Sequence, residues 1–271
     1  MVITAQREID AARAAARCVV EAHHRLTDFL RTGQTLSELD RFVAETLTDL
    51  DCRSAFLRYR MKGHPPFPSH ACLSPNRFVV HGTHDMTAAP TQPGDLLSVD
   101  IGVIHQGWIG DAAWTYAIEN ASAEARKLMA CGRECLRRGI SVLTVGRPLI
   151  DWARTVQQYV ESECGFHLIR GLGGHGYGRT LHGPPFISNV LPSRPGEWPD
   201  AMLPLEPGML LAVEPMLAIG SSATTSDNRK WPVETADGSL AVHYEANILI
   251  TKEGPCDLTE GMDELPDIVG G

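Results

Sequence analysis

DLLSVDIGVIHQGWIGDAAWTY, residues 95–116, is the stretch that decides the fold, because it predicts a β-hairpin. Its first half is rich in Leu, Val and Ile, and its second half carries Trp, Ile and Tyr at positions that suit a strand. Gln106 and Gly107 lie near the middle, where a tight turn is needed. Each predicted strand carries one acid, Asp100 on the first and Asp111 on the second.

The length of the turn sets how the two acids meet. A loop of His105 and Gln106 would place Asp100 directly opposite Asp111, whereas a loop of Gln106 and Gly107 would make the two acids diagonal neighbours. In both registers the carboxylates lie roughly 5–8 Å apart on one face of the sheet. Like charges at that distance repel, and the stretch contains no Lys or Arg. Either a divalent metal lies between the acids, or one acid faces solvent.

Length and composition limit the class of protein. The chain has 271 residues, 43% of them hydrophobic, which is enough for one large domain or two small ones. The net charge of -9, with no basic block, argues against a nucleic-acid surface. The seven cysteines form no C-x-x-C pair, so we expect no disulfide framework and a reducing cytoplasm. Charged residues interrupt every long apolar run, so we expect neither a signal peptide nor a membrane span.

Helical periodicity is present on both sides of the hairpin. Apolar residues predict a helix over 5–31, and a capping box at residues 35–38 opens a second one. Residues 120–140 and 148–163 are expected to form a third and a fourth helix, the latter opened by Pro148. Helices and then strands occur twice in this order, which is typical of an α+β fold.

Residues 52–94 form a loop-rich region with several histidines, and such loops often carry binding residues. A short strand is expected over 77–81, and its last residue, His81, is a candidate acid, base or ligand in a cleft. We interpret the other three histidines as exposed loop residues. They are His64, His70 and His84.

GLGGHGYGRTLHGPP, residues 171–185, formally matches the pattern G-x-G-x-x-G. A dinucleotide-binding loop needs a helix directly after it, and the glycines and prolines that follow exclude one. The glycines instead allow the backbone to pack closely around His175 and His182. These two histidines are either metal ligands or structural residues of a tight bend.

Two glutamates stand in apolar strands. Glu214 follows five apolar residues, and Glu245 lies within a strand predicted over 239–250. A buried and unpaired carboxylate is costly, so the alternative for each is a solvent-facing position, such as an edge strand. With the two aspartates and a histidine, they make up the four carboxylates and one imidazole that a two-metal hydrolytic site requires.

The chain resembles the type I methionine aminopeptidases, which have the pita-bread fold. The segments that carry the resemblance extend to about residue 260: SPNRFVVHGTHD, GDLLSVDIGVIHQGWIGDAAWTY, GGHGYGRTLH, LEPGMLLAVEPM and HYEANILIT. It implies an α+β fold with a curved antiparallel sheet in two pseudo-symmetric halves, covered by four helices. A single domain is expected over residues 1–271, with a short N-terminal segment and a solvated tail from about residue 256.

The resemblance also implies a dinuclear metal site that binds Co, Mn, Fe or Zn. Asp111 and Glu245 would bridge both ions, Asp100 would hold one of them, and His175 and Glu214 the other. Water activated by the metals would remove the N-terminal residue, with the initiator methionine as the first expectation, from a peptide or nascent protein. The implied enzyme is a cytoplasmic monomer that binds neither nucleic acid nor membrane.

Three residues acquire catalytic roles from the resemblance. Glu214 would accept the proton of the attacking water in addition to binding metal. His182 would hydrogen-bond the scissile carbonyl oxygen, and His81 would contact the peptide nitrogen and help to protonate the leaving amine.

The implied substrate pocket departs from the family pattern. Cys72 and Trp231 match family pocket residues, whereas Phe67 and His64 stand where Tyr is common and Leu181 where Phe is frequent. Glu-Ala-Asn at residues 245–247 replaces the more usual Glu-His-Thr. The alternatives are therefore cleavage of another apolar residue or of X-Pro, and a binding protein that has lost its metals. The substrate-binding set is His81, His182, His64, Phe67, Cys72, Leu181 and Trp231.

Overall fold

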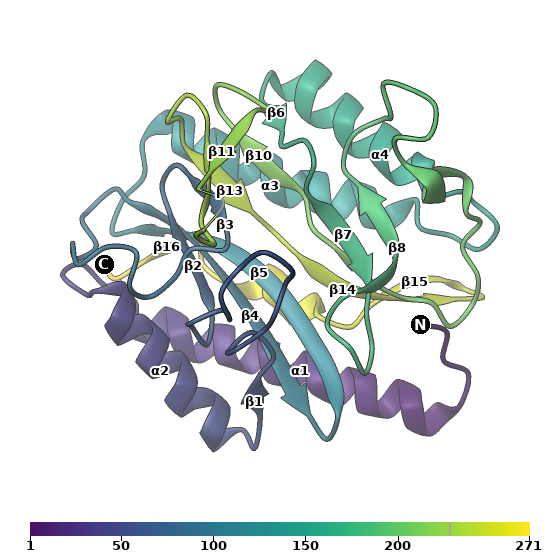
Figure 1. Ribbon diagram of the computed structural model, residues 1–271, viewed down its shortest axis with the longest axis horizontal. Coiled ribbons are helices and arrows are strands. Elements are labelled where there is room, and N and C mark those ends of the chain that lie inside the picture. The colour runs from purple at the N-terminus through teal and green to yellow at the C-terminus, as the bar shows by residue number, and fades with distance from the viewer. Residues whose placement is uncertain (228) are drawn as a thin grey trace.

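Helices and strands follow one another in two similar rounds, and in space the strands lie between two pairs of helices (Figure 1). The computed structural model describes residues 1–227 and 229–271. The α-helices are α1 (Gln6–Phe29), α2 (Leu36–Asp49), α3 (Ala123–Ser141) and α4 (Ile150–Gln157). The strands of the first round are β1 (Arg53–Ser54), β2 (Cys72–Pro75), β3 (Phe78–Val80), β4 (Leu96–His105) and β5 (Trp108–Ile118). Those of the second are β6 (His167–Leu168), β7 (Gly173–Gly176), β8 (Gly183–Ser188), β9 (Leu210–Val213), β10 (Met216–Ala218), β11 (Thr224–Ser226), β12 (Val233–Thr235), β13 (Ala241–His243), β14 (Ala246–Thr251), β15 (Gly254–Asp257) and β16 (Ile268–Val269).

The hairpin of β4 and β5 is the centre of the first sheet, which has the strand order β1-β4-β5-β16 and β2 as a second partner of β4. His105 pairs with Trp108, so Gln106 and Gly107 form the turn. These two residues have φ values of 49° and 79°, as a two-residue hairpin turn with the native twist requires. Of the two loops expected from the sequence, the one formed by Gln106 and Gly107 is therefore correct.

A second five-stranded antiparallel sheet has the order β15-β14-β9-β7-β8. Its strand β7 can lie between β8 and β9 because it is rich in glycine. A Cβ atom on Gly174 would lie 2.2 Å from the Ala212 oxygen, and one on Gly176 would lie 2.1 Å from the Pro184 oxygen. β7 leads to β8 and not to a helix, so the glycine-rich stretch is a sheet element and not a dinucleotide-binding loop.

The helices cover the strands from two ends (Figure 1). Helix α1 packs on β4 and β5 beside α2, whereas α3 packs on β10 and β13 beside α4. The capping box of α2 is present: the Thr35 hydroxyl accepts from the Glu38 amide, and the Glu38 carboxylate accepts from the Thr35 amide. Within residues 1–227 and 229–271, no helix combines the length and the apolar character needed to cross a membrane.

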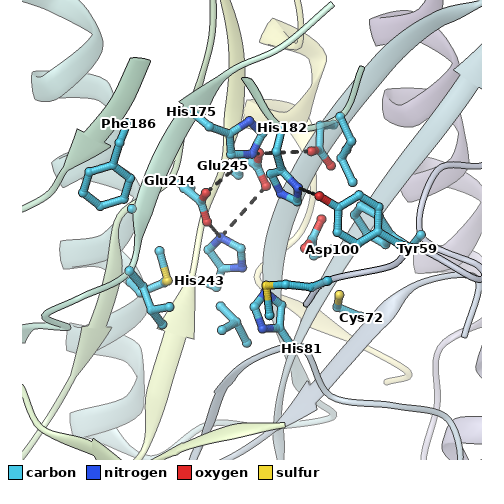
Figure 2. A pocket seen from close by; sticks show the side chains of 18 of the residues that line it. Tyr59, Cys72, His81, Asp100, His175, His182, Phe186, Glu214, His243 and Glu245 are labelled. Atoms are coloured by element: carbon cyan, nitrogen blue, oxygen red, sulfur yellow. Dashed lines mark hydrogen bonds and ion pairs between the residues drawn. The ribbon is translucent and has the colours of Figure 1, made fainter. Parts of the chain in front are cut away.

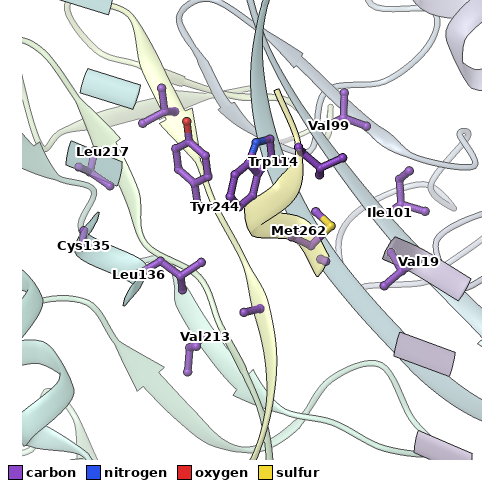
Figure 3. Packing of buried hydrophobic residues seen from close by; sticks show 14 of the residues in the cluster. Val19, Val99, Ile101, Trp114, Cys135, Leu136, Val213, Leu217, Tyr244 and Met262 are labelled. Carbon is purple, nitrogen blue, oxygen red and sulfur yellow. The ribbon is translucent and has the colours of Figure 1, made fainter. Parts of the chain in front are cut away.

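The hydrophobic core joins the two halves (Figure 3). Trp114 of β5 and Tyr244, which follows β13, meet edge to face with ring centroids 4.9 Å apart. Side chains of the first half lie on one side of this pair and those of the second half on the other. They include Val19, Val99 and Ile101 on one side, and Cys135, Leu136, Val213 and Leu217 on the other.

Three features differ from the sequence-based expectations. The solvated tail expected from about residue 256 is wrong, because β15 is followed by a 3-10 helix and by β16, which pairs parallel with β5. Met262 and Leu265 are only 3% exposed, so apolar residues between the acids anchor this segment. The strand predicted over 239–250 is broken into β13 and β14, which belong to different sheets. The fourth helix begins at Ile150 and continues as a π-helix over 158–164.

Candidate metal centre

A cavity of about 670 Å³ collects chemically active side chains from both halves of the molecule (Figure 2). Its lining is mainly apolar, and its polar part, called the floor below, is formed by the acids and histidines. The acids that line it are Asp100, Asp111, Glu214 and Glu245, and the histidines are His81, His175, His182 and His243. Seven of these eight residues are the sequence candidates for ligands and catalytic groups, and the structure brings all seven to one cavity.

The register of the hairpin places the two aspartates. Asp111 pairs with Gly102 and Asp100 pairs with Ala113, so the two acids are diagonal neighbours on one face. Both line the cavity, and Asp111 is 2% exposed, so the alternative of a solvent-facing acid is wrong. The side chain of Asn247 fixes this position, because its Oδ1 accepts the backbone N–H of Asp111 at 2.8 Å.

The two glutamates lie where strands end. Glu214 follows β9 directly, and Glu245 occupies the break between β13 and β14. The Glu245 amide donates to the Ala113 oxygen at 2.9 Å, which holds this acid against the hairpin. Glu245 is 2% exposed, so a position on a solvent-facing edge strand is excluded.

His175 projects from β7 toward the acids. Its Nε2 lies 3.8 Å from Glu214 Oε1 and 4.0 Å from Asp111 Oδ2. Its Nδ1 lies 3.3 Å from the Gly176 oxygen, so Nδ1 can donate there and leave Nε2 free to act as an electron-pair donor. Of the two sequence interpretations, a histidine that only stabilises a bend does not account for these contacts.

The acids lack protein partners. Among the residues that the structure describes, none donates a hydrogen bond to Asp100 Oδ1, Asp111 Oδ1 or Glu245 Oε1, although these atoms are buried. Burial, reinforced by the neighbouring carboxylates, raises the pKa of Asp111 and of Glu245 well above their usual values. Burial also raises the pKa of Asp100 to about 7, although the charge of His243 opposes it.

A divalent cation fits this donor set. No Lys or Arg is found among the described residues that line the cavity, so the charges of the acids lack a counter-ion from the protein. Two sets of three donors have ligand atoms within 4.8 Å of one another: Asp111, His175 and Glu245, and Glu214, His243 and Glu245. Carboxylate oxygens and imidazole nitrogens at such spacing are typical of sites for divalent transition metals.

His81 and His182 stand beside the acids. His81 follows β3 with a φ of 59°, an uncommon backbone conformation that turns its side chain into the cavity. Burial lowers the pKa of each histidine to about 4, so both are neutral at pH 7. The structure adds a residue that the sequence reasoning missed, Tyr59, whose hydroxyl lies 2.6 Å from His182 Nδ1. No motif marks Tyr59, because its loop meets His182 only through the fold.

His243 is a second residue that the sequence reasoning missed. Its Nε2 lies 3.2 Å from Glu214 Oε2 and 4.0 Å from Glu245 Oε2 (Figure 2). A signal for it was present: His243 stands two residues before Glu245, and residues at that spacing in a strand share a face.

The wall of the cavity contains most of the expected substrate-binding residues, namely Phe67, Cys72, Leu181 and Trp231. His64 is not among the described residues that line the cavity. Its ring packs against Trp231 instead, with centroids 5.0 Å apart. Describing His64, His70 and His84 as exposed loop residues is also wrong, because all three are half-buried.

Comparisons with known proteins agree with this geometry. Residues 10–252 match the model of metallopeptidase family M24. The methionine aminopeptidase of Clostridium perfringens is 37% identical over 259 residues, covering 96% of this chain and 98% of the relative. That of Aquifex aeolicus is 35% identical, covering 94% and 97% of the two chains.

Solved structures give the same result. The crystal structure of methionine aminopeptidase from Rickettsia prowazekii has a TM-score of 0.86 and 30% identity, covering 96% of this chain and 100% of that one. The X-Pro aminopeptidase of Thermotoga maritima has a TM-score of 0.74 at 17% identity, covering 99% of this chain and 64% of that one, and so shares the fold alone. The pita-bread fold expected from the sequence is thus confirmed, and the chain belongs to metallopeptidase family M24.

Proposed function

We propose that this chain is a metalloaminopeptidase that removes the N-terminal residue, the initiator methionine, from peptides or nascent proteins. The observation that carries the proposal is the cavity floor, where buried carboxylate oxygens without protein partners face imidazole nitrogens. Relatives that are 35–37% identical and match 94–96% of the chain are named methionine aminopeptidases, which supports an N-terminal methionine as the substrate.

Two divalent ions of Co, Mn, Fe or Zn bind at the cavity floor in this proposal. When bound, they lower the pKa of water and polarise the scissile carbonyl. Asp111 and Glu245 would help to hold both ions, and each of the remaining ligands would hold one of them. The full ligand set is Asp100, Asp111, His175, Glu214 and Glu245.

Glu214 accepts the proton of the attacking water. Burial raises the pKa of Glu214, but the contact with His243 and the charges of His243 and His175 outweigh it, so that the pKa lies below its usual value. Glu214 is therefore ionised near neutral pH, ready to take a proton on a carboxylate oxygen and to pass it to the leaving amine.

His182 donates a hydrogen bond to the scissile carbonyl oxygen. Because burial lowers its pKa to about 4, one ring nitrogen of His182 carries a proton and the other does not. Burial raises the pKa of Tyr59, so its hydroxyl stays protonated and can donate to Nδ1 of His182. That hydrogen bond places the ring proton on Nε2, where it can meet the oxygen on which negative charge develops.

His81 contacts the peptide nitrogen without acting as a strong acid. With a pKa lowered to about 4, it is neutral at pH 7 and carries no extra proton to give. It orients the leaving nitrogen by a hydrogen bond, while the proton itself comes from Glu214. The ring of His81 lies 6.0 Å from that of Trp231, which links it to the wall of the pocket.

The methionine side chain lies against the apolar wall formed by Phe67, Cys72, Leu181 and Trp231. Leu181 leaves more room than the Phe that is frequent in the family, so other apolar residues are the second candidate for the substrate. Cleavage of X-Pro is not favoured, because the X-Pro aminopeptidase is only 17% identical. All five proposed ligands line the cavity, which opposes a binding protein without metals.

The proposed setting is a cytoplasmic monomer that binds neither nucleic acid nor membrane. All seven cysteines are free thiols, which suits a reducing compartment. The net charge of -9 disfavours a polyanionic partner.

The experiment that tests the function is release of the N-terminal residue from X-Ala-Ser and X-Pro peptides, with X varied. The protein is first treated with a chelator and then refilled with Co, Mn, Fe or Zn. Cleavage of Met-Ala-Ser that needs metal supports the proposal. Cleavage of other apolar residues at a higher rate would move the specificity to the second candidate. No cleavage with any metal would refute the enzymatic function.

A further inference from the structure

His243 ends strand β13 at the floor of the cavity and is 2% exposed. It pairs with Met216 of the neighbouring strand β10, and this register brings it beside Glu214. Figure 2 shows its ring below Glu214 and Glu245, directed between the two acids. Apart from its contact with Glu214, this buried imidazole has no part among the proposed ligands and catalytic groups.

The Nε2 atom of His243 is close to carboxylates without forming an aligned hydrogen bond. It lies 3.2 Å from Glu214 Oε2 and 4.0 Å from Glu245 Oε2. Among the described part of the chain, this buried nitrogen has no hydrogen-bond partner of acceptable geometry. A histidine that binds a metal is expected, when the metal is absent, to have a ring nitrogen that lies between acids and lacks a hydrogen-bond partner.

The spacing suits coordination of one ion by these three side chains. Metal–ligand bonds of about 2.0–2.2 Å set neighbouring ligand atoms of a tetrahedral site roughly 3.3–3.6 Å apart. The two distances at His243, 3.2 and 4.0 Å, bracket that range. The ligand atoms of Glu214, His243 and Glu245 all lie within 4.8 Å of one another.

We propose that His243 is a further metal ligand, which joins Glu214 and Glu245 on the ion that His175 also binds. This inference rests on the proposed function, because it adds a sixth ligand to that dinuclear centre. The ion bound by Glu214 then has two imidazoles, and Asp111 and Glu245 remain common to both ions.

A second imidazole changes which metals the centre prefers. Sites made of carboxylates suit Mn and Mg, whereas imidazole favours Fe, Co, Ni and Zn. We therefore expect Co and Zn to outcompete Mn at this position, and removal of the His243 imidazole to weaken Co binding there more than Mn binding.

The test counts imidazole ligands directly. In the Co-substituted protein, each ligating histidine with an N–H gives a strongly shifted proton signal that exchanges with solvent. The wild type is expected to show signals from two histidines, and His243→Gln from one, with its second Co bound at least about tenfold more weakly by calorimetry. Glutamine keeps an N–H donor for Glu214. If His243 only orients Glu214, His243→Gln should therefore lose neither a histidine proton signal nor Co affinity.

The matched control is His84→Gln, which changes a half-buried histidine outside the cavity and should leave both signals in place. X-ray absorption of the wild type with two Co gives the average number of imidazoles per ion without any substitution, expected to be one. Unchanged signals and affinity in His243→Gln would overturn the inference while leaving the proposed function intact. If Asp111→Asn bound Co as tightly as the wild type does, the proposed function itself would be overturned.

Discussion

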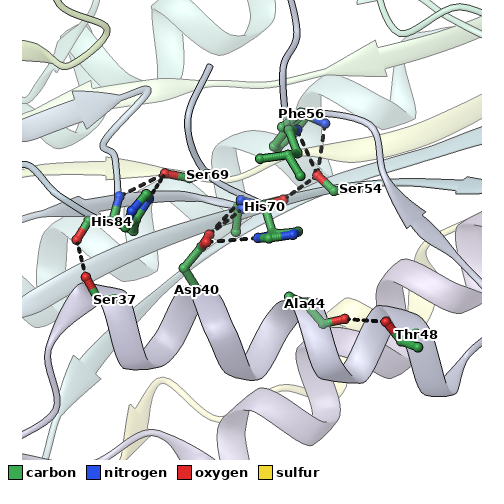
Figure 4. Close-up of polar contacts among 11 residues, drawn as sticks. Ser37, Asp40, Ala44, Thr48, Ser54, Phe56, Ser69, His70 and His84 are labelled. Carbon is green, nitrogen blue, oxygen red and sulfur yellow. Dashed lines mark hydrogen bonds and ion pairs between the residues drawn. The ribbon is translucent and has the colours of Figure 1, made fainter. Parts of the chain in front are cut away.

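Two carboxylates, Asp40 and Asp111, are almost equally buried, with 6% and 2% of their surface exposed, but their surroundings differ. On helix α2, Asp40 Oδ1 accepts the amides of His70 and Ala71 at 2.7 and 3.0 Å (Figure 4). Its Oδ2 lies 3.0 Å from His70 Nδ1. Asp111 Oδ1 has no such partner within the described residues.

Hydrogen-bond partners distinguish the structural acid, Asp40, from the candidate ligand, Asp111. Asp40 is held by the protein's own donors, and its network ties α2 to the loop before β2. Ser69 and His84 extend the network with an Oγ–Nδ1 distance of 2.9 Å. Asp111 lies among other acids, so only a proton or a cation can neutralise its negative charge. Burial alone does not mark a site, whereas several buried carboxylates without partners in one cavity do.

The largest expected effect is on activity. Asp111→Asn should lower kcat/KM for a methionyl peptide by at least about a thousandfold, because it removes a bridging carboxylate and about 4 kcal/mol of transition-state stabilisation. The folded state should be at least as stable in the presence of chelator, since an ionisable buried carboxyl without protein partners is gone. Steady-state kinetics and urea unfolding in EDTA measure the two quantities. Retention of more than a tenth of the activity would contradict the ligand assignment.

The converse substitution should affect stability and not chemistry. Asp40→Ala leaves two backbone N–H groups and the His70 ring without their acceptor, which should lower the free energy of unfolding by about 2–3 kcal/mol. Activity of the metal-loaded protein should stay within about threefold of the wild type. Urea denaturation at 25 °C with the same peptide assay checks both. A large loss of activity at unchanged stability would erase the contrast between the two acids.

The pH dependence of the free energy of unfolding should distinguish the cavity acids, Asp111 among them. The folded-state pKa is raised to about 7 for Asp100 and well above the usual value for Asp111 and Glu245. The folded chain therefore binds more protons than the unfolded chain, and these acids make the metal-free protein less stable as pH rises.

Below about pH 6.5 the neutral histidines of the cavity, His81 and His182, oppose this trend because their pKa values are depressed. The window to measure is therefore pH 6.5–8, with urea unfolding in EDTA. The free energy of unfolding should fall less steeply with pH in Asp111→Asn than in the wild type. The difference in slope should be up to about 1.4 kcal/mol per pH unit, the value for one proton. Identical slopes in wild type and Asp111→Asn would mean that the cavity acids are not protonated in the metal-free state.

The sequence predicted the elements that local patterns determine. Strand residues flanking Gln106-Gly107 predicted the hairpin, and the capping box of Thr35 and Glu38 predicted the start of α2. Because the hairpin has a period of two residues, its register followed once the turn was known, and with it the placement of the two aspartates. The candidate ligands were recognisable because acids in apolar strands are costly without a partner.

Features that depend on long-range packing were not predicted. Tyr59 reaches His182 across 123 positions, and no local pattern connects them. The segment after residue 256 is acidic enough to suggest a solvated tail, yet it docks because Met262 and Leu265 face the core. The break at Glu245 was missed because one apolar pattern runs through two strands that belong to different sheets.

The smallest expected effect concerns a case between Asp40 and Asp111, a histidine that lies in the cavity but has a protein partner. Tyr59→Phe removes the hydroxyl that lies 2.6 Å from His182 Nδ1. Since Tyr59 acts through His182, kcat should fall by about 2- to 10-fold, the value of one hydrogen bond, with KM and metal content unchanged. In the double variant with His182→Ala, the Tyr59 substitution should cost nothing further. If the fold-losses in kcat of the two single variants instead multiplied in the double variant, Tyr59 would act independently of His182. Its hydroxyl would then contact the substrate itself.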